Sequence, residues 1–268
     1  MLKQSLNGTW MMKEVTDTNW IPATIPGSVM SALLANGLTK DPYYRDNEYE
    51  ARELFRKDYE FQREFEITEE FSSNEKVELI CYGLDTLAEI YLNGTLLAKT
   101  NNMHRTWRLD CKELFKPGSN QINIIFRSPI NYIENYQPEE GKEINYIATG
   151  VMKGNQYIRK PHSMFGWDWG AQIPDAGIWR DIELIAFSDA RLADVDIAQH
   201  HKQGNVTLAI TTQLETLQGG SYTLEYELIS PDGISKLYQS LTDENCFNYR
   251  IDIEEPKLWW PNGYGDQP

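Results

Sequence analysis

The chain has 268 residues, of which 41% are hydrophobic and 12% aromatic, enough for one large or two smaller hydrophobic cores. Forty acidic against 25 basic residues give a net charge of -15, which repels phosphate backbones and anionic lipid and so disfavours nucleic acid and membrane surfaces as partners. The mean hydropathy of -0.55 and the lack of a long apolar run exclude a membrane-spanning helix.

The first predicted element is a short helix within PGSVMSALLANGL, residues 26–38. Ser28 can cap its first turn, and Gly37 stands where a left-handed residue commonly ends a helix. We expect Leu33 and Leu34 to form the buried face of this helix. One or two further helical turns are expected in PINYIENYQPEE, residues 129–140.

Strands are predicted for most of the remaining first 188 residues. In YEFQREFEI, residues 59–67, alternate positions are apolar and only Arg63 is out of phase, which is typical of a half-buried strand. The other predicted strands are KVELICYG (76–83), LAEIYLNGTLLAK (87–99) with an Asn93-Gly94 hairpin turn, NQINIIFRS (120–128) and the long strand GIWRDIELIAF (177–187).

The pattern changes near SDAR, residues 188–191. Closely spaced alternating strands then follow without helices, separated by QGGS and SPDGIS turns: a weak run through Val195 and Ile197, then 206–210, 222–228 and 247–253. This spacing predicts a small antiparallel sandwich. The sequence therefore predicts an all-β chain with two domains, residues 1–188 and 189–268.

Motifs for cofactor or metal chemistry are missing from the sequence. It contains no phosphate loop, dinucleotide fingerprint, zinc-ligand helix or nucleophile elbow, so no cofactor and no metal are expected. His200 and His201 are adjacent on a predicted strand and would point to opposite faces. Cys81, Cys111 and Cys246 have no metal-like spacing, and the start MLKQSLNGTW has no apolar signal region; both observations favour a cytoplasmic location with reduced thiols.

The segment MFGWDWGAQIPDAGIWR, residues 164–180, concentrates aromatic residues around a carboxylate. Trp167, Asp168 and Trp169 are consecutive and lie between Gly166 and Gly170, a composition that predicts a shaped loop. An indole can cover the C–H face of a neutral sugar while a carboxylate accepts hydrogen bonds from its hydroxyls. The competing interpretation is core tryptophans beside a surface aspartate.

Seven stretches of the chain resemble the N-terminal part of glycoside hydrolase family 2, specifically its β-mannosidase branch. In chain order these are LNGTW, IPGSVMSALLANGL, DPYYRDNEYEARELFRKDYEFQREF, GLDTLAEIYLNGTLLAKTNNMHRTWRLD, IRKPHSMFGWDWG, GIWRDIEL and LWWPNGYGDQP. GLDT and YLNG resemble the family broadly, whereas NMHR and GWDWG resemble the branch. The chain departs from the branch at Ala171, where proline is common, and lacks a common tryptophan near Leu54 and Phe55.

The resemblance implies a jelly-roll, galactose-binding-like β-sandwich over residues 1–188, an immunoglobulin-like β-sandwich after it, and a catalytic (β/α)8 barrel. That barrel would remove terminal non-reducing β-D-mannose residues through two glutamates, with retention and without a cofactor. These 268 residues hold no such barrel, so the resemblance implies a non-catalytic N-terminal part with an incomplete second sandwich, whose partners are a β-mannoside and its own C-terminal barrel. It assigns Asp168 and Trp169 to the mannose and Trp167 to a neighbouring wall.

Two other functions remain open from the sequence. A stand-alone carbohydrate-binding module would need only the first domain, although LWWPNGYG and the second domain speak against it. Another exo-glycosidase of family 2, such as an exo-β-glucosaminidase, would also contain GIWRDI. Reading the gene downstream of codon 268 for a barrel with two glutamates would distinguish an enzyme from a binding module.

Overall fold

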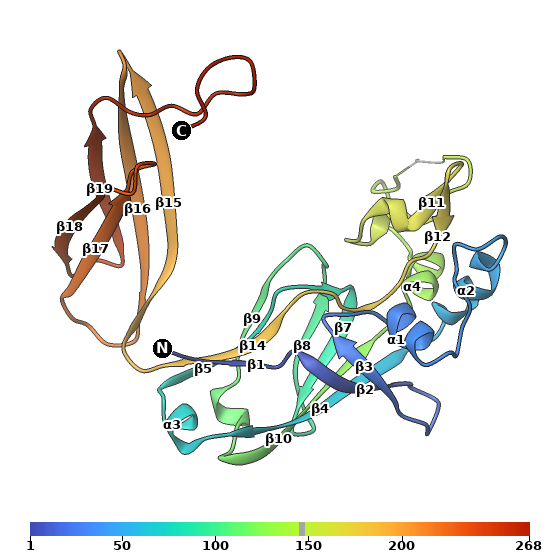
Figure 1. Cartoon of the computed structure of the whole chain (residues 1–268). Helices are drawn as coiled ribbons and strands as arrows, with labels where there is room; N and C mark the ends of the chain where they lie inside the picture. Colours follow the sequence, from blue (N-terminus) through green and yellow to red (C-terminus); the bar gives the residue numbers. More distant parts are fainter. Residues whose placement is uncertain (145–147) are drawn as a thin grey trace. The chain divides into compact units, whose positions relative to one another are not determined.

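A computed structural model describes residues 1–144 and 148–268 of the chain. It divides the chain into two compact units, Met1–Ala186 and Phe187–Pro268 (Figure 1). Strands dominate both units, so the predicted all-β fold is confirmed.

The first unit is built from two main antiparallel sheets. One has the order β1-β14-β5-β9 and consists of β1 (Leu2–Ser5), β14 (Ile182–Phe187), β5 (Lys76–Cys81) and β9 (Trp107–Asp110). The other has the order β3-β2-β4-β10-β7-β8 and consists of β3 (Ile21–Ile25), β2 (Gly8–Glu14), β4 (Tyr59–Ile67), β10 (Gly118–Phe126), β7 (Leu87–Leu92) and β8 (Thr95–Asn101). A two-stranded ladder joins β6 (Leu84–Asp85) to β13 (Gly177–Ile178).

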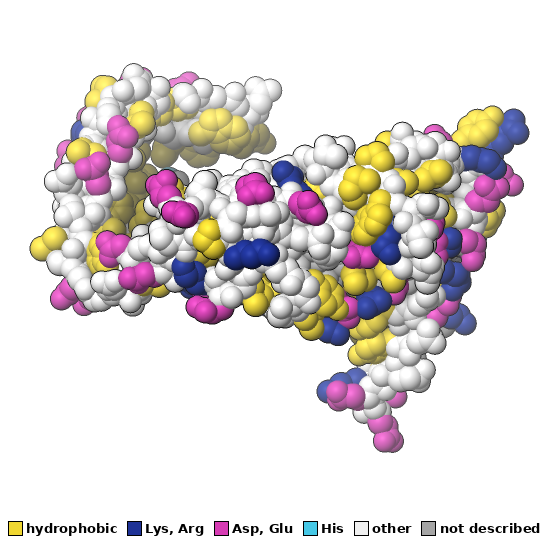
Figure 2. All heavy atoms as spheres, turned by 90° about the horizontal axis from the view of Figure 1, so that it is seen from below, with side chains coloured by type: hydrophobic (Ala, Val, Ile, Leu, Met, Phe, Trp, Pro, Cys, Tyr) yellow, Lys and Arg dark blue, Asp and Glu magenta, His cyan; other side chains and the backbone are white. Residues whose placement is uncertain are grey.

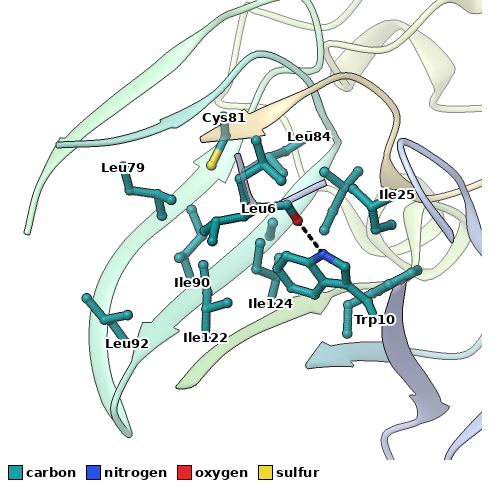
Figure 3. Close-up of a cluster of buried hydrophobic side chains, with 14 of the residues drawn as sticks. Leu6, Trp10, Ile25, Leu79, Cys81, Leu84, Ile90, Leu92, Ile122 and Ile124 are labelled. Atoms are coloured by element: carbon teal, nitrogen blue, oxygen red, sulfur yellow. Dashed lines mark hydrogen bonds between the residues drawn. The ribbon is translucent and has the colours of Figure 1, made fainter. Parts of the chain in front are cut away.

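The hydrophobic core of this unit lies between the two sheets. Every second residue of β4 and β10 points inward, and Phe61 meets Phe126 edge to face with ring centroids 5.6 Å apart. Figure 3 shows Trp10 among the aliphatic side chains, with its indole Nε1 donating to the Leu6 carbonyl at 2.8 Å. Buried residues from both sheets thus make one continuous core.

The helix predicted after Ser28 is α1 (Val29–Ala35). Ser28 caps it by accepting from the Ser31 backbone N, and Gly37 has the expected left-handed φ of +66°, so both predictions are confirmed. The buried face predicted for Leu34 is wrong, because this side chain is 39% exposed and only Leu33 of the two packs on the core. One residue further along a helix is a rotation of about 100°, which carries Leu34 past the narrow buried stripe.

Other short helices pack around the sheets. The helical turns expected after residue 128 are confirmed as α4 (Pro129–Asn135), capped by Ser128. The remaining helices of the described chain were not predicted; they are α2 (Glu48–Leu54), α3 (Glu69–Ser72), η1 (Lys112–Leu114), η2 (Asn155–Tyr157) and η3 (His162–Met164).

The Asn93-Gly94 turn between β7 and β8 is confirmed, with φ values of +50° and +80° as a tight hairpin requires. The single long strand expected over residues 177–187 is wrong. The chain pairs first with β6, then breaks at residues 179–181, and then pairs with β1. Trp179 marks the break: its ring lies so close to Gly83 that a Cβ there would be 2.5 Å from the indole nitrogen.

The second unit is a small sandwich of antiparallel strands, as predicted. A three-stranded sheet contains β15 (Ala190–Lys202), β16 (Asn205–Thr216) and β19 (Cys246–Ile253), and the pair β17 (Tyr222–Ile229) and β18 (Ser235–Thr242) packs on it. Strand β18 was not predicted from the sequence. The hydrophobic alternation of β15 is weak in the sequence, and in the structure its apolar residues Leu192, Val195 and Ile197 are exposed.

The predicted division into domains 1–188 and 189–268 can be tested by truncation. We expect residues 1–188 to unfold cooperatively on heating, because the buried core cluster of the first unit is formed by residues between Leu6 and Ala186. Circular dichroism melting of the truncated chain is the measurement. A broad transition without a defined midpoint would show that the division is wrong.

Candidate functional site

The Trp-Asp-Trp segment forms the tip of a two-stranded ribbon instead of the loop expected from its glycines. Strand β11 (Phe165–Trp167) pairs with β12 (Gly170–Gln172), so that Trp167 stands opposite Gly170. Asp168 and Trp169 make the two-residue turn between them. The turn projects both side chains from a hydrogen-bonded hairpin, which holds them more firmly than a loop would.

Two glycines allow a neighbouring segment to lie directly against this ribbon. Gly166 has a φ of +91°, and a Cβ there would stand 2.4 Å from Gln172 Cγ and 2.7 Å from the Gly150 carbonyl oxygen. Gly150 has a φ of +79°, and its Cβ would stand 3.0 Å from the Trp167 backbone. Both positions therefore require glycine for conformation and for space.

Hydrogen bonds fix the base of the ribbon. The Met152 backbone N donates to the Phe165 carbonyl at 3.0 Å, and Gln172 Nε2 donates to the Gly150 carbonyl at 2.8 Å. Arg52 of α2 donates to Gln172 Oε1. Because Phe165 is fully buried, the ribbon grows out of a packed base while its tip stays free.

The tip presents its aromatic and acidic groups to solvent. Trp169 is 81% exposed and Trp167 37% exposed, with indole centroids 5.1 Å apart and ring planes at 37°. Asp168 is also exposed, and its carboxylate has no hydrogen bond or ion pair with any described residue. The interpretation of Trp169 as a core residue is therefore wrong. Exposed indoles can stack on a neutral polyhydroxylated ligand, and the Asp168 carboxylate can accept hydrogen bonds from its hydroxyls.

A buried polar cluster lies where the ribbon segment leaves the sandwich. Lys160 pairs with Asp85, and burial lowers the pKa of Lys160. The Asp175 carboxylate accepts from the backbone N of Met30 at 3.1 Å and of Ala176 at 2.7 Å, while burial raises its pKa to about 6. This cluster was not predicted from the sequence, since no regular spacing connects residues 85, 160 and 175.

The other candidate groups show no assembled site. Within residues 1–144 and 148–268, no three His, Cys, Asp or Glu side chains come together in a way that could hold a metal ion. His200 and His201 lie on β15, and His201 Nε2 is 3.3 Å from Gln199 Oε1. Cys81 is buried, and burial raises the pKa of its thiol to about 12, so it is a poor nucleophile at neutral pH.

Two surface properties bear on possible partners. On the face shown in Figure 2, acidic and basic side chains are interspersed among the described residues and no extended basic patch gathers there. No helix in the described part of the chain is both long and apolar enough to cross a membrane.

Comparisons with known proteins agree with the resemblance read from the motifs. The sequence is 31% identical to a β-mannosidase of Mus musculus over 98% of this chain and 31% of that protein. It is 30% identical to β-mannosidase B of Neosartorya fischeri over 97% of this chain and 32% of that protein. The chain thus spans about a third of the length of these relatives.

Solved structures show the same relationship. The crystal structure of a β-D-mannosidase from Dictyoglomus thermophilum matches 99% of this chain and 33% of its own, with a TM-score of 0.88 and 30% identity. The exo-chitosanase of Amycolatopsis orientalis matches with a TM-score of 0.65 and 16% identity, which shows a shared fold alone.

The model of the family described as glycosyl hydrolase 2 galactose-binding domain-like matches residues 10–180, which include the whole ribbon. The chain therefore belongs to this family of glycoside hydrolase family 2 domains.

Proposed function

We propose that this chain is the non-catalytic N-terminal part of a retaining β-mannosidase, and that Trp167, Asp168 and Trp169 contact the terminal β-mannosyl residue. The observation that carries this proposal is the ribbon tip, where an exposed carboxylate without an internal partner is flanked in sequence by two exposed indoles. The similarity to β-mannosidases over 97–98% of this chain supports the choice of sugar.

In this proposal the chain binds the sugar and another part of the enzyme cleaves it. Retaining hydrolysis needs two carboxyl groups about 5 Å apart, one as acid/base and one as nucleophile. Both would come from a (β/α)8 barrel, which is the proposed partner of this chain. Asp168 would accept hydrogen bonds from mannose hydroxyls, and the face of Trp169 would cover the apolar side of the ring.

We also propose a cytoplasmic location without a cofactor. Cys81, Cys111 and Cys246 are free cysteines, which supports a reducing compartment. Fractionation of cells that make the protein would test the location.

The 268-residue chain alone is expected not to hydrolyse an aryl β-mannoside, because the proposal places both catalytic carboxyls outside it. The measurement is release of the aryl group by purified protein, with an aryl β-glucosaminide tested in parallel. Turnover of the mannoside that disappears when a glutamate of this chain is replaced would contradict the proposal. Tight binding of free mannose by the chain alone would instead favour a stand-alone binding module.

A further inference from the structure

Lys160 is a buried cation that the proposed sugar contacts do not use. Its side chain is fully buried, and Nζ forms an ion pair with Oδ2 of Asp85, which is itself almost fully buried. Nζ also donates to the Asp175 backbone carbonyl at 2.7 Å. Thr86 Oγ1 donates to the other carboxylate oxygen of Asp85. One ammonium group therefore joins two segments that are far apart in sequence.

These contacts lie at both ends of the segment that carries the ribbon. Just before Lys160, the backbone of Arg159 forms an isolated bridge to Asn102, and from there the chain runs out to the tip. Just after Asp175, the chain enters β13, which pairs with the short strand β6. Asp85 belongs to β6. Lys160 thus links the outgoing end, the returning end and the sandwich.

The stability of the fold does not by itself explain the Lys160–Asp85 ion pair. Removing an ammonium group from water is costly, and burial accordingly lowers the pKa of Lys160. A buried ion pair can often be replaced by apolar side chains without loss of stability. Apolar side chains make no directional contacts. The hydrogen bonds of Lys160 are directional, and so they fix where the Asp175 carbonyl lies relative to β6.

We propose that Lys160 is a positioning residue, which ties both ends of residues 160–175 to β6 and so holds the ribbon that presents Asp168. Its importance for sugar binding rests on the proposed function of the ribbon. The tie itself is independent of that function and can be measured in the 268-residue chain.

The test compares two double variants by hydrogen exchange. Lys160→Met with Asp85→Asn removes the tie without leaving a lone buried charge, which a single substitution at Lys160 would do. The control, Arg108→Met with Glu78→Gln, removes a different ion pair, which is partly buried and joins β9 to β5 in the four-stranded sheet.

Loss of the tie should increase exchange only in the ribbon. In the first double variant, amides of residues 164–173 should exchange at least about 10-fold faster, while those of β10 stay close to the parent chain. The control should leave residues 164–173 unchanged. Equal acceleration in both variants, or none in either, would overturn the proposal. If the first variant does not fold, Lys160→Leu with Asp85→Asn, which also leaves no lone buried charge, should give the same ribbon-selective change, and its absence overturns the proposal equally.

A second measurement separates the tie from the function of the ribbon. In the barrel-containing enzyme, the first double variant should lower kcat/KM at least about 10-fold, whereas the control variant should retain the parent kcat/KM. Faster exchange in the ribbon with unchanged kcat/KM would support the tie and contradict the sugar-binding role proposed for Asp168.

Discussion

In the barrel-containing enzyme that the proposed function requires, Asp168→Ala is expected to lower kcat/KM on an aryl β-mannoside by about 10- to 10⁴-fold. The reason is the loss of one or two charge-assisted hydrogen bonds to mannose hydroxyls, each contributing about 1.5–3 kcal/mol. The melting temperature should not change, because the Asp168 carboxylate is exposed and bonds to no described residue.

A matched control separates loss of this contact from loss of any surface charge. Glu64 of β4 is also exposed, and its carboxylate has no hydrogen bond or ion pair within the described chain, so Glu64→Ala removes one negative charge away from the ribbon. We expect Glu64→Ala to retain the parent kcat/KM. An unchanged kcat/KM for Asp168→Ala would make the ribbon a scaffold, and a large fall in its melting temperature would make Asp168 a folding residue.

Local sequence signals predicted those parts of the fold that short stretches determine. The strand predicted from the alternation in residues 59–67 and the hairpin turn predicted at Asn93-Gly94 both form, because strand faces and hairpin turns depend on adjacent residues. The prediction of one continuous strand over residues 177–187 is wrong because that segment depends on residues distant in sequence. Its break follows from a change of pairing partner and from the packing of Trp179 on Gly83, and neither contact is visible in a local pattern.

The candidate site shows the same division. The composition around Asp168 pointed to the tip, and Gly166 has the unusual backbone that its position suggested. The sequence left the exposure of Trp169 open between the sugar-contact and the core interpretations, because an indole in a sequence more often indicates a buried side chain. The Lys160 tie was equally invisible, since it joins Asp85 and Asp175 through contacts across 75 and 15 residues.

Trp10 offers the largest expected effect on stability. Its side chain is 1% exposed within the core between the two sheets, where Figure 3 shows it beside Leu6 and Ile25. Trp10→Ala should lower the free energy of unfolding of the first unit by about 3–5 kcal/mol, since the lost burial is followed by a cavity that the sheets cannot close. For a unit of this size the melting temperature should fall by about 6–20 °C.

The loss of unfolding free energy in Trp10→Ala should arise from lost packing and not from a buried polar group left without a hydrogen bond. The Leu6 carbonyl, which accepts from the Trp10 indole, also accepts from Arg63 Nη1 at 2.6 Å and so keeps a partner after the substitution. Trp169→Ala is the matched control, because the same change at an 81% exposed indole should alter the free energy of unfolding by less than about 0.5 kcal/mol. Urea unfolding of both variants measures the difference. Equal losses of unfolding free energy would mean that the Trp169 indole packs on the fold and is not free to bind a ligand. A loss confined to Trp10→Ala would assign Trp10 to the core and leave Trp169 available for binding.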